Sequence, residues 1–164
     1  ERRLLREMAE SAWKTGDPGC YFIDAAENHN PTPWLGTLTG TNPCGEVPLL
    51  DNEPCNLGSI NLGHFVVPGG VVDFPRLAIV AFNATHFLDD ILEANTFPHA
   101  DITRQARTTR KLGLGVMGWA DLLALLHVPY DSQEALGIAE EVIGRWPVIE
   151  YALERAEREE KLPS

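Results

Sequence analysis

Apolar residues recur at helical spacing in two stretches of the chain, and both stretches predict amphipathic helices. The longer stripe follows Asp73, a residue that can cap a helix, and consists of Leu77, Val80, Ala81, Ala84, Phe87, Leu88, Ile91 and Leu92. The stripe at the start of the chain consists of Leu4, Leu5, Met8, Ala12 and Trp13. This first helix should end at the turn 15–19, whose Gly and Pro residues interrupt helices.

Two more helices are expected towards the end of the chain. One spans 119–127, and the other begins after Asp131, whose distance from Glu134 is that of a capping box. Pro147 should kink or split this last helical region, because proline removes a helix hydrogen bond.

Short apolar runs between these helices predict strands. Residues 20–23 are expected to form a short buried strand that contains Cys20, and residues 57–67 a longer one. The turn Pro68-Gly69-Gly70 should lead into a strand at 71–72, and a Gly-rich apolar segment follows at 112–118. Helices that alternate with short strands indicate the α/β fold class.

Composition and charge narrow the functional classes. The 164 residues are 44% hydrophobic and 23% charged, as in a globular domain with a sizeable core. The formal net charge of -11 argues against a surface that coats nucleic acid. No apolar run is long enough to span a membrane, so we expect a cytoplasmic protein. Three irregularly spaced cysteines form no disulfide framework, and the missing initiator Met indicates a piece of a larger protein.

Two patterns resemble known binding motifs, one for a dinucleotide and one for zinc, but both lack the context that these sites need. The segment Gly113–Gly118 fits G-x-G-x-x-G, but a dinucleotide site needs an apolar strand before it, and residues 105–111 are polar and basic. We therefore expect these glycines to allow close packing of a strand and a helix. Cys44, Cys55 and His64 lack the paired spacing of a zinc site, so no metal is expected.

The irregular stretch 24–54 contains the strongest candidate site. Pro43 and Gly45 flank Cys44 and should hold it at the tip of a tight loop. In an extended backbone alternate residues share a face, so Asn42, Cys44 and Glu46 could present an amide, a thiol and a carboxylate to one ligand. The simpler interpretation is a turn that carries a buried, unreactive cysteine.

This region resembles the active-site region of ribonucleotide reductase large chains, most closely the adenosylcobalamin-dependent class II enzymes. The resemblance rests on TNPCGE followed by CNLGSINL, and the flanking landmarks occur in the family's order: TGDPG, FLDD, RKLGLGVMGWADLL and PYDS. It covers nearly the whole chain. The combination is far more specific than any single motif.

The resemblance implies a role for each candidate residue. Cys44 corresponds to the thiyl-radical cysteine, Glu46 to the general base, Asn42 to the partner of the sugar hydroxyls, and Cys55 to one half of the reducing dithiol. The second cysteine of that dithiol lies upstream of this segment in the family. Cys20 stands where relatives usually carry an aliphatic residue.

The resemblance also implies the fold and the partners. Residues 1–164 would form part of a catalytic domain, a ten-stranded α/β barrel with the Cys44 loop in its interior. The substrate would be a ribonucleoside di- or triphosphate, the radical source adenosylcobalamin, and the reductant a thioredoxin-like or other dithiol. No residue is assigned to the cofactor, no nucleic acid or membrane partner is expected, and a homodimer is one assembly open to the full-length protein.

Two alternatives remain open at this point. The same chemistry could be driven by a separate metal-containing radical subunit, as in class I reductases. A non-catalytic structural domain could also retain a barrel-derived sequence, although a scaffold has no need of Asn42, Cys44, Glu46 and Cys55 together.

Overall fold

The computed structural model describes residues 2–144 and divides the chain into two units. The first unit is Glu1–Asn52 and the second is Glu53–Ser164, and each is described by itself. The elements of the first unit are α1 (Arg2–Thr15), α2 (Ile23–Glu27), β1 (Gly40–Thr41) and β2 (Pro48–Leu49).

The first helix ends where the sequence predicts. Gly16 follows α1 with a positive φ of 86°, and its N–H donates to the carbonyl of Ala12. A glycine adopts this left-handed backbone without steric cost, which is why the helix stops there. None of the described residues of α1 is buried.

The buried strand expected at 20–23 is wrong. Cys20 is exposed, Phe22 is 76% exposed, and Ile23 begins α2. A short apolar run is compatible with either a strand or a helix. Here Asp24 lies in the first turn of the helix, where a negative charge stabilises the helix N-terminus.

The side chain of Glu27 links α2 to the segment that leads into β1. Glu27 at the end of α2 accepts a 2.7 Å hydrogen bond from the backbone N–H of Leu38. Leu38 and Leu50 are both buried, so the segments on either side of the β1–β2 hairpin are fixed by apolar burial as well. The stretch 24–54 is therefore less irregular than the sequence predicts.

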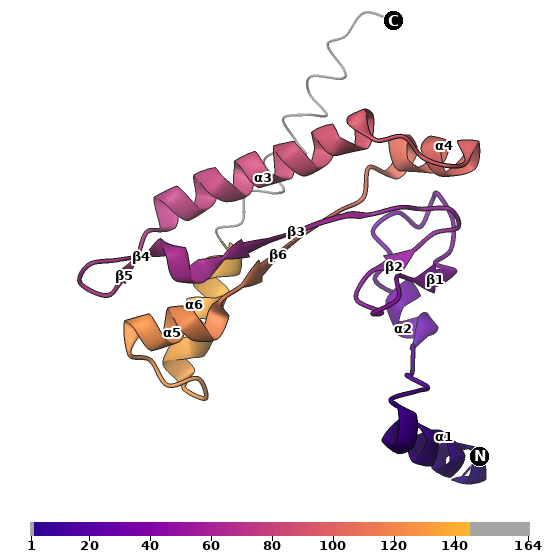
Figure 1. Ribbon diagram of the computed structural model, residues 1–164, viewed down its shortest axis with the longest axis horizontal. Helices are drawn as coiled ribbons and strands as arrows, with labels where there is room; N and C mark the ends of the chain where they lie inside the picture. The colour runs from indigo at the N-terminus through magenta and orange to yellow at the C-terminus, as the bar shows by residue number, and fades with distance from the viewer. Residues whose placement is uncertain (1, 145–164) are drawn as a thin grey trace, which may run out of the picture. The chain divides into compact units, whose positions relative to one another are not determined.

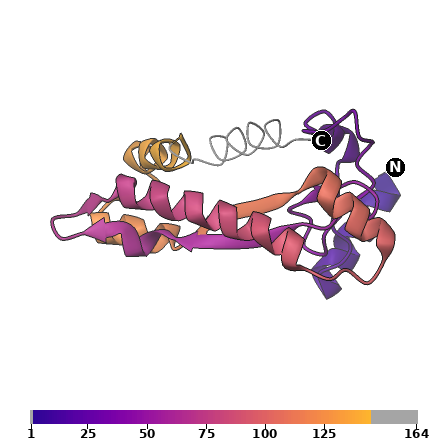
Figure 2. The same ribbon diagram turned by 90° about the horizontal axis from the view of Figure 1, so that it is seen from above.

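The second unit is built on a pair of parallel strands, β3 (Asn56–Asn61) and β6 (Leu112–Met117). Parallel strands need a long crossover connection, and α3 (Phe74–Ala94) is the longest element of it. Figures 1 and 2 show α3 running along both strands. The mixed helix and strand content agrees with the predicted class. Each sheet among residues 2–144 has two strands.

The predicted strand 57–67 is only partly correct, because β3 ends at Asn61. The side chain of Asn61 accepts a hydrogen bond from the N–H of Gly63 and so caps a 3-10 helix, η1 (Leu62–Phe65). The predicted turn at 68–70 is confirmed, since it joins β4 (Val66–Val67) to β5 (Val71–Val72) as an antiparallel pair.

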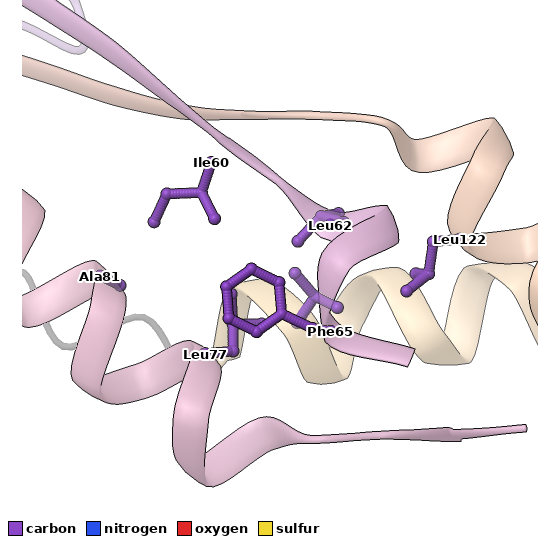
Figure 3. Packing of buried hydrophobic residues seen from close by; sticks show 7 residues of the cluster. Ile60, Leu62, Phe65, Leu77, Ala81 and Leu122 are labelled. Atoms are coloured by element: carbon purple, nitrogen blue, oxygen red, sulfur yellow. The ribbon is translucent and has the colours of Figure 1, made fainter. Parts of the chain in front are cut away.

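The core of the second unit forms where β3, η1, α3, α5 and α6 meet (Figure 3). Its buried members are Ile60, Leu62, Phe65, Leu77, Ala81, Leu122 and Val142. Leu77 and Ala81 come from the predicted apolar stripe of α3. The cap is also confirmed, because the Asp73 carboxylate accepts from the N–H of Arg76.

Arg110 directly follows α4 (Ala100–Thr109), and its side chain binds α3. It has a positive φ of 45°, and its guanidinium donates to the carboxylate of the buried Asp89 at 2.8 Å and to the carbonyl of Asp89 at 3.2 Å. The same guanidinium also pairs with Glu93. This fork of donors fixes the point at which the chain enters β6.

The last described helices are α5 (Trp119–Leu126) and α6 (Gln133–Gly144). Both are predicted, but the capping residue of α6 is Ser132 rather than Asp131, because the Ser132 hydroxyl accepts from the N–H of Ala135. The expected kink at Pro147 lies outside the described residues.

Gly118→Ala should destabilise the protein. Gly118 has a positive φ of 68°, and a Cβ there would collide with Asn61 Oδ1, which caps η1. The left-handed backbone alone costs about 1–2 kcal/mol for an alanine, and the displaced Asn61 adds to this. Urea unfolding followed by circular dichroism measures the loss.

Gly115→Ala is the matched control from the same segment. Its Cβ would lie 3.8 Å from Ser59 Oγ, an ordinary contact, and its φ is not positive. We expect this variant to be within about 1 kcal/mol of the parent. Equal destabilisation by the two substitutions would contradict the assignment of Gly118 as the constrained position.

Candidate functional site

Three of the four candidate residues lie in the loop between β1 and β2. The two strands pair antiparallel, with Gly40 opposite Leu49 and Thr41 opposite Pro48. The N–H of Thr39 donates to the carbonyl of Leu49 at 2.9 Å and extends the pairing by one step. The loop from Asn42 to Val47 is therefore held at both of its ends.

Asn42 closes this loop with its side chain as well as its backbone. Its Oδ1 accepts a 3.0 Å hydrogen bond from the N–H of Val47, and its own N–H donates to the Val47 carbonyl at 3.4 Å. The Asn42 carbonyl accepts from the N–H of Gly45 at 3.0 Å, which forms a tight turn. The residue assigned to the substrate is thus also part of the loop's framework.

The structure places Cys44 in the turn, as the sequence predicts. Cys44 and Glu46 are exposed, and Gly45 has a positive φ of 84° that suits a glycine. Because the backbone turns between Asn42 and Gly45, the alternation of an extended strand does not apply here. That Asn42, Cys44 and Glu46 face one ligand stays a prediction.

Cys55 belongs to the second unit, one residue before β3. It is half-buried, and its Sγ lies 3.6 Å from the carbonyl of Asn56. Burial raises the pKa of the Cys55 thiol, the nearby Lys111 ammonium opposes this, and the Glu53 carboxylate adds to it. The net effect is to favour the protonated thiol.

An ion pair that the sequence analysis did not single out lies beside Cys55. Lys111 Nζ is 2.8 Å from Glu53 Oε2, and the Glu53 side chain is fully buried. In the sequence Lys111 is only the last residue of the polar and basic segment 105–111. The register Asn56↔Leu112 brings Lys111 next to Cys55, and no local sequence signal reveals such a register.

The G-x-G-x-x-G segment is a strand rather than a phosphate-binding turn. Residues 112–117 form β6, so the first two glycines lie inside the sheet. A Cβ on Gly113 would collide with Leu57 Cδ2 and would lie 3.6 Å from Cys55 Sγ. The expected close packing of a strand and a helix is therefore only partly correct. Gly113 gives room to Leu57 of the neighbouring strand β3, whereas Gly118 gives room to Asn61, which caps η1.

Among residues 2–144, no group of three His, Cys, Asp or Glu side chains is placed to hold a metal ion. In the same part of the chain, no helix is long and apolar enough to cross a membrane.

Comparison with known proteins identifies the family. Residues 1–156 match the family model described as "Ribonucleotide reductase, barrel domain". This match covers most of the chain, which therefore belongs to the ribonucleotide reductase family.

The relatives are consistent with this family. A "Vitamin B12-dependent ribonucleoside-diphosphate reductase" of Thermoplasma acidophilum is 51% identical over 142 residues, 87% of this chain and 18% of the relative. The protein of that name from Mycobacterium tuberculosis is 45% identical over 96% of this chain and 23% of its own length. A "Ribonucleoside-diphosphate reductase subunit alpha" of Chlamydia pneumoniae is 31% identical over 94% of this chain and 15% of the relative. The chain spans about a fifth of the length of these proteins.

The environment of Cys55 predicts slow alkylation. In the reduced, folded protein at pH 7, iodoacetamide should modify Cys55 more slowly than the exposed Cys20 and Cys44, because only the thiolate reacts and the raised pKa keeps Cys55 protonated. Its rate should rise only at a pH above the ordinary thiol range. Peptide mass spectrometry resolves the three sites.

Unfolding in urea is the control for this experiment, since it removes the burial that raises the pKa. The three cysteines should then react at similar rates. If folded Cys55 reacts as fast as it does in urea, the described environment of this thiol is wrong.

Proposed function

We propose that the full-length protein reduces ribonucleoside di- or triphosphates to 2'-deoxyribonucleotides by thiyl-radical chemistry. The observation that carries the proposal is an exposed cysteine at the tip of the Asn42–Val47 loop in a chain of the ribonucleotide reductase barrel family. In this proposal residues 1–164 are part of a catalytic domain, a ten-stranded α/β barrel whose interior receives the loop.

Cys44 begins the reaction as a thiyl radical and removes the 3'-hydrogen of the ribose. The S–H bond formed and the C–H bond broken are close in strength, so the transfer is feasible in both directions. Exposure at a turn supports this role, because the sulfur has to reach a carbon atom of the substrate. The same thiol later returns the hydrogen to C3', which regenerates the radical.

Glu46 takes the proton of the 3'-hydroxyl, and the protonated 2'-oxygen then leaves as water. Glu46 is exposed two residues from Cys44, where a carboxylate can approach a substrate held by the loop. The Oδ1 of Asn42 is bound to Val47, so its Nδ2 is the end that donates to a sugar hydroxyl. A neutral amide orients the hydroxyl without competing for its proton.

Cys55 supplies reducing equivalents together with a second cysteine from elsewhere in the full-length protein. The C2'–OH bond is replaced by C2'–H, one water leaves, and the two thiols lose two electrons and two protons as an S–S bond forms. A thioredoxin-like or other dithiol then reduces this disulfide. The half-buried position of Cys55 supports a role in which the thiol is protected until a partner sulfur reaches it.

Adenosylcobalamin, when bound, supplies an organic radical to such a reaction. The exposed Cys44 thiol fits this source, because it offers an accessible hydrogen atom, whereas the described residues give no reason to assign a corrin contact. The B12-dependent names of the Thermoplasma and Mycobacterium relatives support the proposal. We further propose a cytoplasmic location and, for the full-length protein, a homodimer.

Three serine variants of the full-length protein separate the proposed roles. Cys44→Ser should abolish both deoxynucleotide formation and release of a 3'-tritium label, while nucleotide binding persists. Cys55→Ser should still release tritium but form no normal product, because the dithiol is needed only after the sugar radical exists. Cys20→Ser is the matched control and should keep full turnover.

A purely structural role makes a different prediction. Serine at the half-buried Cys55 would lower the free energy of unfolding by up to about 1–3 kcal/mol, and activity would fall only in proportion to folding. A Cys44→Ser enzyme that melts normally and keeps full turnover would show that Cys44 carries no radical.

The radical source has its own test. The full-length protein should turn over without oxygen when given adenosylcobalamin, a dithiol and substrate, with no second protein chain. Formation of deoxynucleotide is measured by chromatography, with cyanocobalamin as the control because it cannot release an organic radical. Activity that requires a metal-loaded partner subunit would move the protein to class I.

A further inference from the structure

The Glu53–Lys111 ion pair is unusually well shielded from water. Glu53 Oε2 and Lys111 Nζ are 2.8 Å apart, and the two side chains are 0% and 15% exposed. Within residues 2–144 this pair joins the segment before β3 to the segment before β6. Cys55 is one position before β3 and Lys111 one position before β6, so the parallel register places the thiol next to the ammonium.

Stability alone is a weak explanation for such a pair. Removing both charges from water costs several kcal/mol, and apolar side chains of similar size often stabilise a protein equally well. β3 and β6 already pair through six register positions and pack against α3. The location of the charges next to a thiol points to a role for which charge is needed.

The pair's two charges act on the thiol in opposite directions. The Lys111 ammonium stabilises the Cys55 thiolate and the Glu53 carboxylate destabilises it. On the neighbouring helix α3, the carboxylates of Asp89 and Glu93 both form ion pairs with Arg110. Lys111 and Glu53 are therefore the charges that bear on Cys55.

We propose that the Glu53–Lys111 pair is a positioning element for Cys55 that sets how readily this sulfur exchanges its proton as the dithiol is used and restored. The inference rests on the proposed function, in which Cys55 is half of that dithiol. Lys111 and Glu53 are positioning residues, since they act through the cysteine and not on the nucleotide.

The chemical step at issue is thiol–disulfide exchange. When the external dithiol restores the enzyme, its thiolate bonds to the partner sulfur, the S–S bond breaks, and Cys55 Sγ leaves with the electron pair as a thiolate that then takes up a proton. Lys111 stabilises this leaving thiolate. Glu53 holds the ammonium in place and limits its effect, so the resting sulfur keeps its proton.

Substitution of each partner should shift the thiol in opposite directions. In reduced full-length protein, Lys111→Met should move the midpoint of the pH profile for Cys55 alkylation upward, because the favourable positive charge is lost. Glu53→Gln should move it downward. At a fixed pH below the midpoint we expect rates about three- to tenfold lower and higher, respectively, than in the parent.

Two matched variants separate charge from packing. Lys111→Arg keeps the positive charge and should leave the midpoint close to that of the parent. The double variant Glu53→Gln, Lys111→Met removes both charges and should also return towards the parent. If the substitutions act by loosening the packing, every variant exposes the thiol. Both single substitutions would then shift the pH profile in the same direction, and both would raise the alkylation rate reached at high pH.

Circular dichroism shows whether each variant folds, and the proposal can be tested even if one of them does not. Either single variant carries a signed prediction, and a shift of the opposite sign, or no shift, overturns the proposal. The proposed function fails separately, if Cys55→Ser forms normal product. Alkylation is measured without substrate or cofactor, so its result does not depend on turnover.

Discussion

The parallel pairing of β3 with β6 is the constraint on which the second unit depends. It joins residues 56–61 to residues 112–117 and so requires a long crossover, whose main element is α3. The apolar stripe of α3 then has a surface to cover, which closes the core around Leu77 and Ala81. The same register brings Lys111 to Cys55, so one set of backbone hydrogen bonds determines the packing and the chemical environment of the thiol.

The candidate residues depend on two different kinds of support. Asn42, Cys44 and Glu46 lie in a hairpin loop that is closed by its own hydrogen bonds, from Val47 to Asn42 and from Gly45 to Asn42. Cys55 depends on contacts between segments far apart in the chain. An exposed thiol on a local turn suits a group that must reach a substrate, whereas a half-buried thiol beside fixed charges suits one whose protonation has to be controlled.

Arg110 shows how the protein handles a second buried charge. Its guanidinium binds both the carboxylate and the backbone carbonyl of Asp89, and it also pairs with Glu93. This satisfies several donors at once and anchors α3 just before the chain enters β6. The neighbouring Lys111 makes a simpler pair with Glu53, and an ammonium beside a thiol acts on it as a point charge.

The sequence by itself determined the features that depend on neighbouring residues: the end of α1 at Gly16, the cap at Asp73, the turn at 68–70 and the position of Cys44 between Pro43 and Gly45. Its motifs also identified the family before any geometry was known. Tertiary structure alone decided that Cys20 is exposed, that β3 ends at Asn61, and that Glu53 meets Lys111, 58 positions away. The physical reason is range: caps and turns are satisfied within a few residues, whereas burial, strand register and ion pairing depend on which distant segment arrives, and no local pattern records that.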